Sequence, residues 1–152
     1  MALFSTHPLL TEEERKKISE IIAEVERKTN GEIRVSIRKR RAWNERKLTL
    51  HRFALKNFYE LGMDKTRHKS GVLLFFSMSE RSFQIIADEG IHKKVSDRYW
   101  DELAATMTGH FKEQRFCDGI CEVIKEIGKK LEQEFPRTSN DVDELPNDVA
   151  IK

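Results

Sequence analysis

Hydrophobic positions along the chain follow two spacings, one typical of amphipathic helices and one typical of strands. Apolar residues recur at helical spacing over residues 18–25, and Thr11 with Glu14 in front of them has the form of a capping box. The stretch 32–38 (EIRVSIR) alternates strictly. That alternation predicts a strand with one face in water, and therefore a strand near an edge of the sheet.

The middle of the chain predicts a helix and two further strands. Apolar residues over 50–61 mark a second amphipathic helix, which should stop at Gly62. Residues 72–76 are apolar on both faces, as expected of a central strand, and strand, helix and strand in this order favour a parallel right-handed crossover. The four residues MSER separate the apolar run VLLFFS (72–77) from the run SFQIIA (82–87), which is too few for a parallel connection, so we expect the third strand, at 83–87, to form an antiparallel hairpin with the second.

The last part of the chain predicts two more helices and a tail. Ser96 is a candidate N-cap for a helix that should end in a break containing Gly109, and apolar spacing over 120–131 predicts a final helix that ends before Pro136. Residues 136–152 lack periodicity and are rich in Asp, Asn and Pro, which indicates a mobile acidic tail. The predicted organisation is an N-terminal arm (1–10), one α/β domain (11–135) and this tail.

Composition narrows the class of protein. A chain of 152 residues can bury a core in a single domain without disulfides or metals. Cys117 and Cys121 share one helix face. A buried packing role is favoured for them over a role as two of the ligands of a metal site. The N-terminal MALFSTHPLL does not resemble a signal peptide, and no apolar run is long enough to span a membrane. We therefore expect a soluble, cytoplasmic protein.

Charge is unevenly distributed, because Lys and Arg outnumber Asp and Glu in residues 1–70 and the reverse holds in 71–152. A basic patch with an aromatic residue, typical of nucleic-acid binding, stands at residues 38–47. No nucleic-acid fold signature accompanies the patch, so a solvated, disordered turn is the favoured interpretation and nucleic acid is an unfavoured partner. Docking of the acidic tail on this patch is another hypothesis. The patch consists of Arg38, Lys39, Arg40, Arg41, Trp43, Arg46 and Lys47.

Acidic residues should gather at one edge of the predicted sheet. With the first two strands parallel and the next two antiparallel, Glu32, Asp64, Asp88 and Glu89 lie at the same edge. Calcium and magnesium prefer several carboxylate and carbonyl oxygens from flexible loops, and glycines in these loops would supply the flexibility. The sequence therefore predicts a divalent-cation site here, while the alternative is that these acids only form turns or cap helices.

A catalytic role for the same edge would need a phosphate held through the bound metal. Lys65, Arg67 or His68 could contact that phosphate, and a carboxylate or His could relay a proton. The sequence singles out no nucleophile, so catalytic residues are not assigned.

Three phrases resemble the TPM domain family, named for a thylakoid lumen protein, a photosystem II repair protein and a modulator of acetylcholine receptors. They are TNGEIRV (29–35), GVLLFF (71–76) and FKEQRFCDGI (111–120), and the resemblance covers residues 11–135. It implies a three-layer α/β/α sandwich with a small mixed sheet containing one parallel βαβ crossover and a β-hairpin. It further implies divalent-cation binding by acidic loops and, for the plant lumen member, acid phosphatase activity.

The resemblance also includes Asp118, a further candidate metal ligand. Asp118 starts the last predicted helix, at the opposite end from the acidic edge, and an N-cap role accounts for it. The first functional hypothesis is a non-catalytic interaction module that binds a divalent cation and a protein partner. The alternative is a metal-assisted phosphatase, and a lesser alternative is nucleic-acid or anion binding through residues 38–47.

Overall fold

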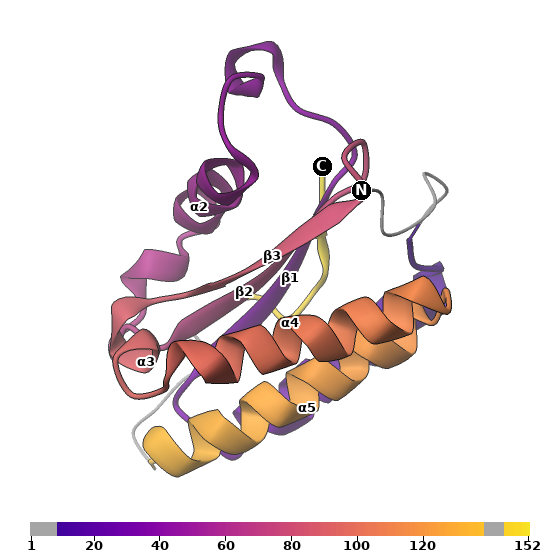
Figure 1. The fold of residues 1–152 in the computed structure, drawn as a ribbon. Helices are drawn as coiled ribbons and strands as arrows, with labels where there is room; N and C mark the ends of the chain where they lie inside the picture. The colour runs from indigo at the N-terminus through magenta and orange to yellow at the C-terminus, as the bar shows by residue number, and fades with distance from the viewer. Residues whose placement is uncertain (1–8, 139–144) are drawn as a thin grey trace.

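A mixed four-stranded sheet lies between two layers of helices (Figure 1). The computed structural model describes residues 9–138 and 145–152. The strand order is β3-β2-β1-β4, in which β1 (Glu32–Arg38) is parallel to β2 (Gly71–Ser77) and β2 is antiparallel to β3 (Ser82–Ala87). A short β4 (Ala150–Ile151) pairs with β1 in parallel. The α/β sandwich with its crossover and hairpin is thus confirmed.

The two faces of the sheet carry different cores. One face packs its Ile33, Val35 and Phe76 side chains against three long helices, and the opposite face packs Leu73 and Phe75 against a single helix that carries Phe53. Figure 1 shows α4 and α5 on one side of the sheet and α2 on the other. The helices are α1 (Glu12–Glu26), α2 (Leu50–Glu60), α3 (Glu89–His92), α4 (Asp97–Lys112) and α5 (Phe116–Glu134), with 3-10 turns η1 (Trp43–Glu45) and η2 (Met63–Lys65).

Helix boundaries follow the capping residues in the sequence. The Thr11 hydroxyl accepts from the Glu14 backbone N–H and the Glu14 carboxylate accepts from that of Thr11, so the capping box is confirmed. Ser96 caps α4 as expected. Helix α2 ends just before Gly62, whose φ of 73° is a left-handed conformation that glycine adopts without steric cost.

The expectation that β1 has a wet face near the sheet edge is wrong. It is an interior strand, and the side chains of its polar face, Glu32, Ser36 and Arg38, are buried. An alternating pattern reports polarity and not exposure, and the polar face here lies under the α2 layer. Arg38 is buried because Glu45 and Asn57 supply acceptors for its guanidinium.

The break expected at Gly109 is also wrong. Helix α4 runs through Gly109 to Lys112. Gly109 lies on the exposed helix surface, with no atom of a neighbouring element within 4 Å of where a Cβ would be, and a helix tolerates glycine there at a modest cost. The chain turns instead after Lys112, where Gln114 adopts a φ of 60°.

The tail expectation is wrong for its described residues. Ala150 and Ile151 pair with Ser36 and Ile37, and the Lys39 N–H donates to the Lys152 carbonyl oxygen over 2.8 Å. The 11–135 domain therefore also includes residues 145–152. Residues 1–8 of the expected arm and residues 139–144 of the tail lie outside the described residues.

Candidate functional site

Glu32 and Asp88 flank Gly71 at the edge of the sheet. Glu32 pairs with Gly71 across β1 and β2, and the Asp88 N–H donates to the Gly71 carbonyl oxygen over 2.9 Å. The neighbouring residues Ile33 and Val72 point into the three-helix core, so Glu32 and Asp88 lie on the opposite face, toward α2. The predicted strand order thus places two of the four candidate carboxylates on one face.

The turn η2 passes directly over Gly71 and brings Asp64 to the same edge. A Cβ on Gly71 would lie 3.0 Å from the Met63 carbonyl oxygen, so a side chain there would have to push this turn outward. The Asp64 side chain is half-buried, and its Oδ1 is buried with no hydrogen-bond partner among the described residues. The Lys69 ammonium donates to the Asp64 backbone carbonyl.

Asp88 caps the short helix α3. Its Oδ1 accepts from the Glu89 N–H over 2.8 Å, whereas its Oδ2 is buried without a hydrogen-bond partner in the part of the chain that the structure describes. A Cβ on Gly90 would clash with the carbonyl oxygens of His68 and Lys69, so α3 and the 66–70 loop are in close backbone contact. Glu89 is exposed at the first position of α3 and faces solvent.

Asp118 lies far from this edge. It is the third residue of α5 and therefore belongs to the first turn, while the residue that caps the helix is Arg115 and not Asp118 as expected. The C-terminal end of α5 reaches the start of β1, since the Asn30 N–H donates to the Phe135 carbonyl oxygen. At 1.5 Å per residue, Asp118 stands roughly 25 Å away along the helix. We call the group of Glu32, Asp64 and Asp88 the acidic edge. Asp118 is too far away to join it.

The basic residues expected near this edge are placed differently from one another. Lys65 and Arg67 are exposed, and His68 is half-buried with its Nε2 3.4 Å from the Asn30 amide nitrogen. The His68 ring also packs against that of Phe135. His68 thus joins the 66–70 loop to the end of α5, and in the described part of the chain it forms no ion pair with a carboxylate.

The acidic edge is not a preformed metal centre. Across residues 9–138 and 145–152, no group of three or more His, Cys, Asp or Glu side chains has the geometry to hold a metal ion. The edge offers three carboxylates as hard oxygen donors, and two of them have a buried oxygen without a hydrogen-bond partner among the described residues.

The interpretation of residues 38–47 as a solvated, disordered turn is wrong, because two of its arginines form ion pairs. The Arg38 guanidinium lies 2.7 Å from the Glu45 carboxylate, and Lys56 contacts the other oxygen of that carboxylate at 2.7 Å. Arg41 pairs with Glu80 at 2.8 Å. These hydrogen bonds, that from Arg38 foremost, lower the pKa of Glu45 to about 2.

Sequence spacing does not predict this ion-pair network, since Glu80 lies 39 positions from Arg41 and the pairing of Glu45 depends on how the turn folds. Both Arg38 and Arg41 also lie over the ring of Phe53, at 4.9 and 4.7 Å from its centroid. The network leaves Trp43 at the surface, 80% exposed, with the Arg46 guanidinium 5.3 Å from its ring.

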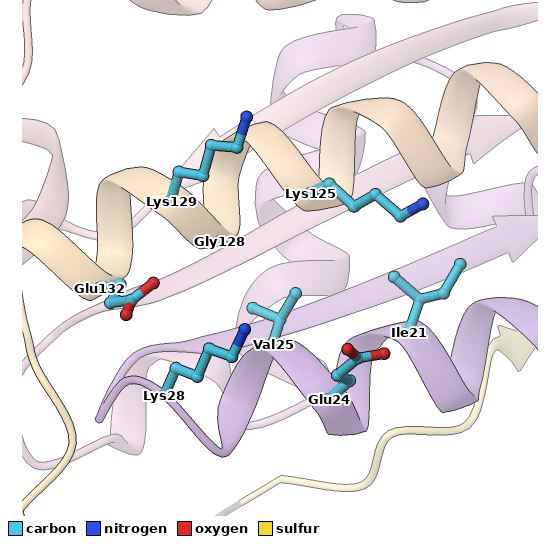
Figure 2. Close-up of a pocket in the computed structure, with 8 residues that line it drawn as sticks. All are labelled: Ile21, Glu24, Val25, Lys28, Lys125, Gly128, Lys129 and Glu132. Carbon is cyan, nitrogen blue, oxygen red and sulfur yellow. The ribbon is translucent and has the colours of Figure 1, made fainter.

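A shallow hollow of about 230 Å³ lies between α1 and α5 (Figure 2). Figure 2 shows Val25 pointing from α1 toward Gly128 of α5, and a Cβ on Gly128 would lie 2.7 Å from a Val25 methyl group. Three lysines (28, 125 and 129) and two glutamates (24 and 132) surround this floor. Opposite charges around a shallow hollow are typical of a solvated helix pair, and this hollow adds nothing to the acidic edge.

The two cysteines are packing residues, as the sequence favours. Their sulfur atoms are 3.8 Å apart, both thiols are free and buried, and burial raises the pKa of Cys117 to about 12. A thiol that resists deprotonation is a poor nucleophile and a poor metal ligand.

Fold and site together define an α/β/α sandwich domain with an acidic edge at the start of its two parallel strands. The family model TPM_phosphatase, described as the TPM domain, matches residues 5–130. The chain belongs to the TPM domain family. In the described residues, no helix combines the length and the apolar character needed to cross a membrane.

Solved structures agree with this assignment. The BA42 protein from the psychrophilic bacterium Bizionia argentinensis, determined by NMR, is 33% identical with a TM-score of 0.84, over 96% of this chain and 97% of that one. The N-terminal domain of a P. gingivalis protein is 18% identical with a TM-score of 0.64, over 84% of this chain and 79% of that one, and shows a shared fold. No curated protein matches.

Proposed function

We propose that this TPM domain is an interaction module that binds a divalent cation, calcium or magnesium, at its acidic edge. The observation that carries the proposal is the strand register, which sets Glu32 and Asp88 on either side of Gly71 with Asp64 in the turn above. Glu32 is 2% exposed, so its carboxylate lies at the buried side of this edge.

The donor set favours a hard cation that binds weakly. Asp64 Oδ1 and Asp88 Oδ2 are buried acceptors, and the carbonyl oxygens of Met63, His68 and Lys69 come close to Gly71 and Gly90 on the same loops. Glu89 would join only if α3 turned its exposed first residue inward. Because no complete ligand group is preformed in the described residues, we expect a dissociation constant of roughly 10⁻⁴–10⁻³ M, as in weak calcium sites.

Calorimetric titration with CaCl₂ and with MgCl₂ tests the site. Asp88→Asn keeps the size of the side chain and one acceptor while removing the charge, so it should weaken binding by about tenfold or more. Asp118→Asn is the matched control, an exposed acid on α5, and should change the affinity by less than about twofold. An absence of saturable binding at millimolar concentration would refute the site, and equal losses in both variants would show unspecific charge effects.

The interaction half of the proposal is supported by Trp43. Interface hot spots are enriched in Trp and Arg, and here an exposed Trp43 lies under Arg46 on a turn fixed by the buried Arg38–Glu45 pair. Because the buried Arg38–Glu45 pair holds the turn that carries Trp43, a protein partner would bind it at a smaller entropic cost than a free loop.

The second candidate function is a metal-assisted phosphatase, favoured by the name of the matching family model. The exposed Lys65 and Arg67 lie one and three positions after Asp64 and could contact a phosphate next to a cation. Hydrolysis of p-nitrophenyl phosphate with and without magnesium separates the two functions. Turnover that needs magnesium and is lost in Asp88→Asn supports the enzyme, whereas cation binding without turnover supports the interaction module alone.

A further inference from the structure

A cavity of about 660 Å³ lies at the other end of the sheet from the acidic edge. It opens where β1, β2 and β4 finish, and three backbone hydrogen bonds hold these chain ends together: Met78 N–H to Arg38 O, Ser79 N–H to Lys39 O and Lys39 N–H to Lys152 O. Ligands of α/β proteins commonly bind beyond the carboxyl ends of parallel strands, and a volume of this size suits a small organic molecule.

The wall of the cavity is apolar and its rim is cationic. Leu9, Leu10, Ile37 and Met78 are buried, and Ile151 of β4 is 39% exposed. The polar lining residues are Arg15, Lys39, Arg40 and Ser79, and no carboxylate is among the described residues that line it.

The cations at the rim are available to a ligand. Arg15 also lines a smaller neighbouring hollow with Glu12 and Asp148, so its charge is shared, although its Nε is buried without a hydrogen-bond partner in the described structure. Lys39 and Arg40 are exposed, and no described carboxylate pairs with either side chain. An apolar wall beside unpaired cations is complementary to a molecule with an anionic head and an apolar tail.

We propose that this cavity binds a free fatty acid. The carboxylate lies at the rim against Lys39 and Arg40, and the hydrocarbon tail covers Ile37, Met78 and Ile151. The site is independent of the acidic edge, because β1 separates the two by its seven residues, roughly 20 Å of strand.

Calorimetry and amide NMR shifts on the full chain test the proposal, with fatty acids kept below their micelle concentrations. Dodecanoate should bind saturably, with shift changes at Leu10, Met78 and Ile151. From octanoate to dodecanoate the affinity should rise by up to about fourfold per added methylene as the tail is buried. Dodecyltrimethylammonium has the same tail with a positive head and should not bind.

Variants separate head-group recognition from general stickiness. The double variant Lys39→Gln and Arg40→Gln removes both cations at the rim, so it should weaken the binding of dodecanoate by roughly tenfold. Both side chains are at the surface, so the fold should stay intact. Lys65→Gln with Lys93→Gln, exposed lysines beside the acidic edge, is the matched control and should change the affinity by less than about twofold. Equal binding of the cationic detergent, affinity independent of tail length, shift changes confined to the hollow of Figure 2, or binding seen only with lipid vesicles would each overturn the proposal.

Discussion

Removing the charge of Glu45 should destabilise the fold strongly, although Glu45 lies outside both proposed sites. Its carboxylate is 1% exposed and accepts from Arg38, from Lys56 and from the Ala42 N–H. Glu45→Gln keeps the shape and one acceptor oxygen, but it leaves Arg38, a residue only 4% exposed, without its counter-ion. Breaking a buried pair from one side is costly because the remaining charge stays out of water.

The magnitude follows from the pKa of Glu45. It is lowered from 4.5 to about 2, first by the Arg38 hydrogen bond. At 1.36 kcal/mol per pKa unit this corresponds to roughly 3 kcal/mol of folding free energy carried by the ionised form. Because the folded-state pKa is the lower one, this stabilisation is fully present above about pH 4.5 and is lost as the pH falls toward 2.

Urea unfolding at pH 7 measures the effect as a fall of about 3 kcal/mol in the free energy of unfolding for Glu45→Gln. Glu60→Gln is the control, since Glu60 contacts the same Lys56 but is 43% exposed, and it should cost less than about 1 kcal/mol. The variant should also lose less stability than the wild type between pH 4.5 and 2. A cost below 1 kcal/mol, or an unchanged acid dependence, would refute the assignment of the buried pair.

Two further predictions concern glycine and the surface of residues 38–47. Gly109→Ala should raise the free energy of unfolding by about 0.5–1 kcal/mol, since nothing lies near its Cβ position. Gly128→Val should lower the free energy of unfolding by about 1–3 kcal/mol, because the new side chain collides with Val25. Thermal unfolding measures both, and two changes of the same sign would contradict the packing. Single-stranded DNA should bind with a dissociation constant no lower than about 10⁻⁴ M at physiological salt, because Arg38 and Arg41 are held in ion pairs. Fluorescence anisotropy measures this constant. Micromolar binding that is lost in Trp43→Ala would prove the prediction wrong.

The strand arrangement could be predicted because local rules were sufficient for it. Four residues between β2 and β3 allow only a hairpin, and a helix between β1 and β2 favours a parallel crossover. Those two rules predict Glu32 and Asp88 at one edge of the sheet, and the register sets both beside Gly71. The position of Asp64 also followed, since the chain must return over the start of β2 after Gly62.

Long-range pairing could not be predicted from spacing. Arg41 and Glu80 are 39 positions apart, and a basic run appears the same whether its charges face water or a buried carboxylate. The two-residue β4 is too short for any period to register, and Gly109 appeared as a break because propensity weighs the residue without its surroundings. The fatty-acid cavity was missed for a similar reason, since Leu10, Met78 and Ile151 come from three distant segments.

Completion of the sheet by β4 has a consequence for the newly made chain. Synthesis of β1 is complete at residue 38, whereas β4, which covers its edge, is complete only 113 residues later, at Ile151. At about 5–20 residues per second, this interval lasts roughly 6–23 s. During it the backbone groups of Ser36 and Ile37 that β4 later covers are open to pairing with any other extended segment, including the same strand of a second copy.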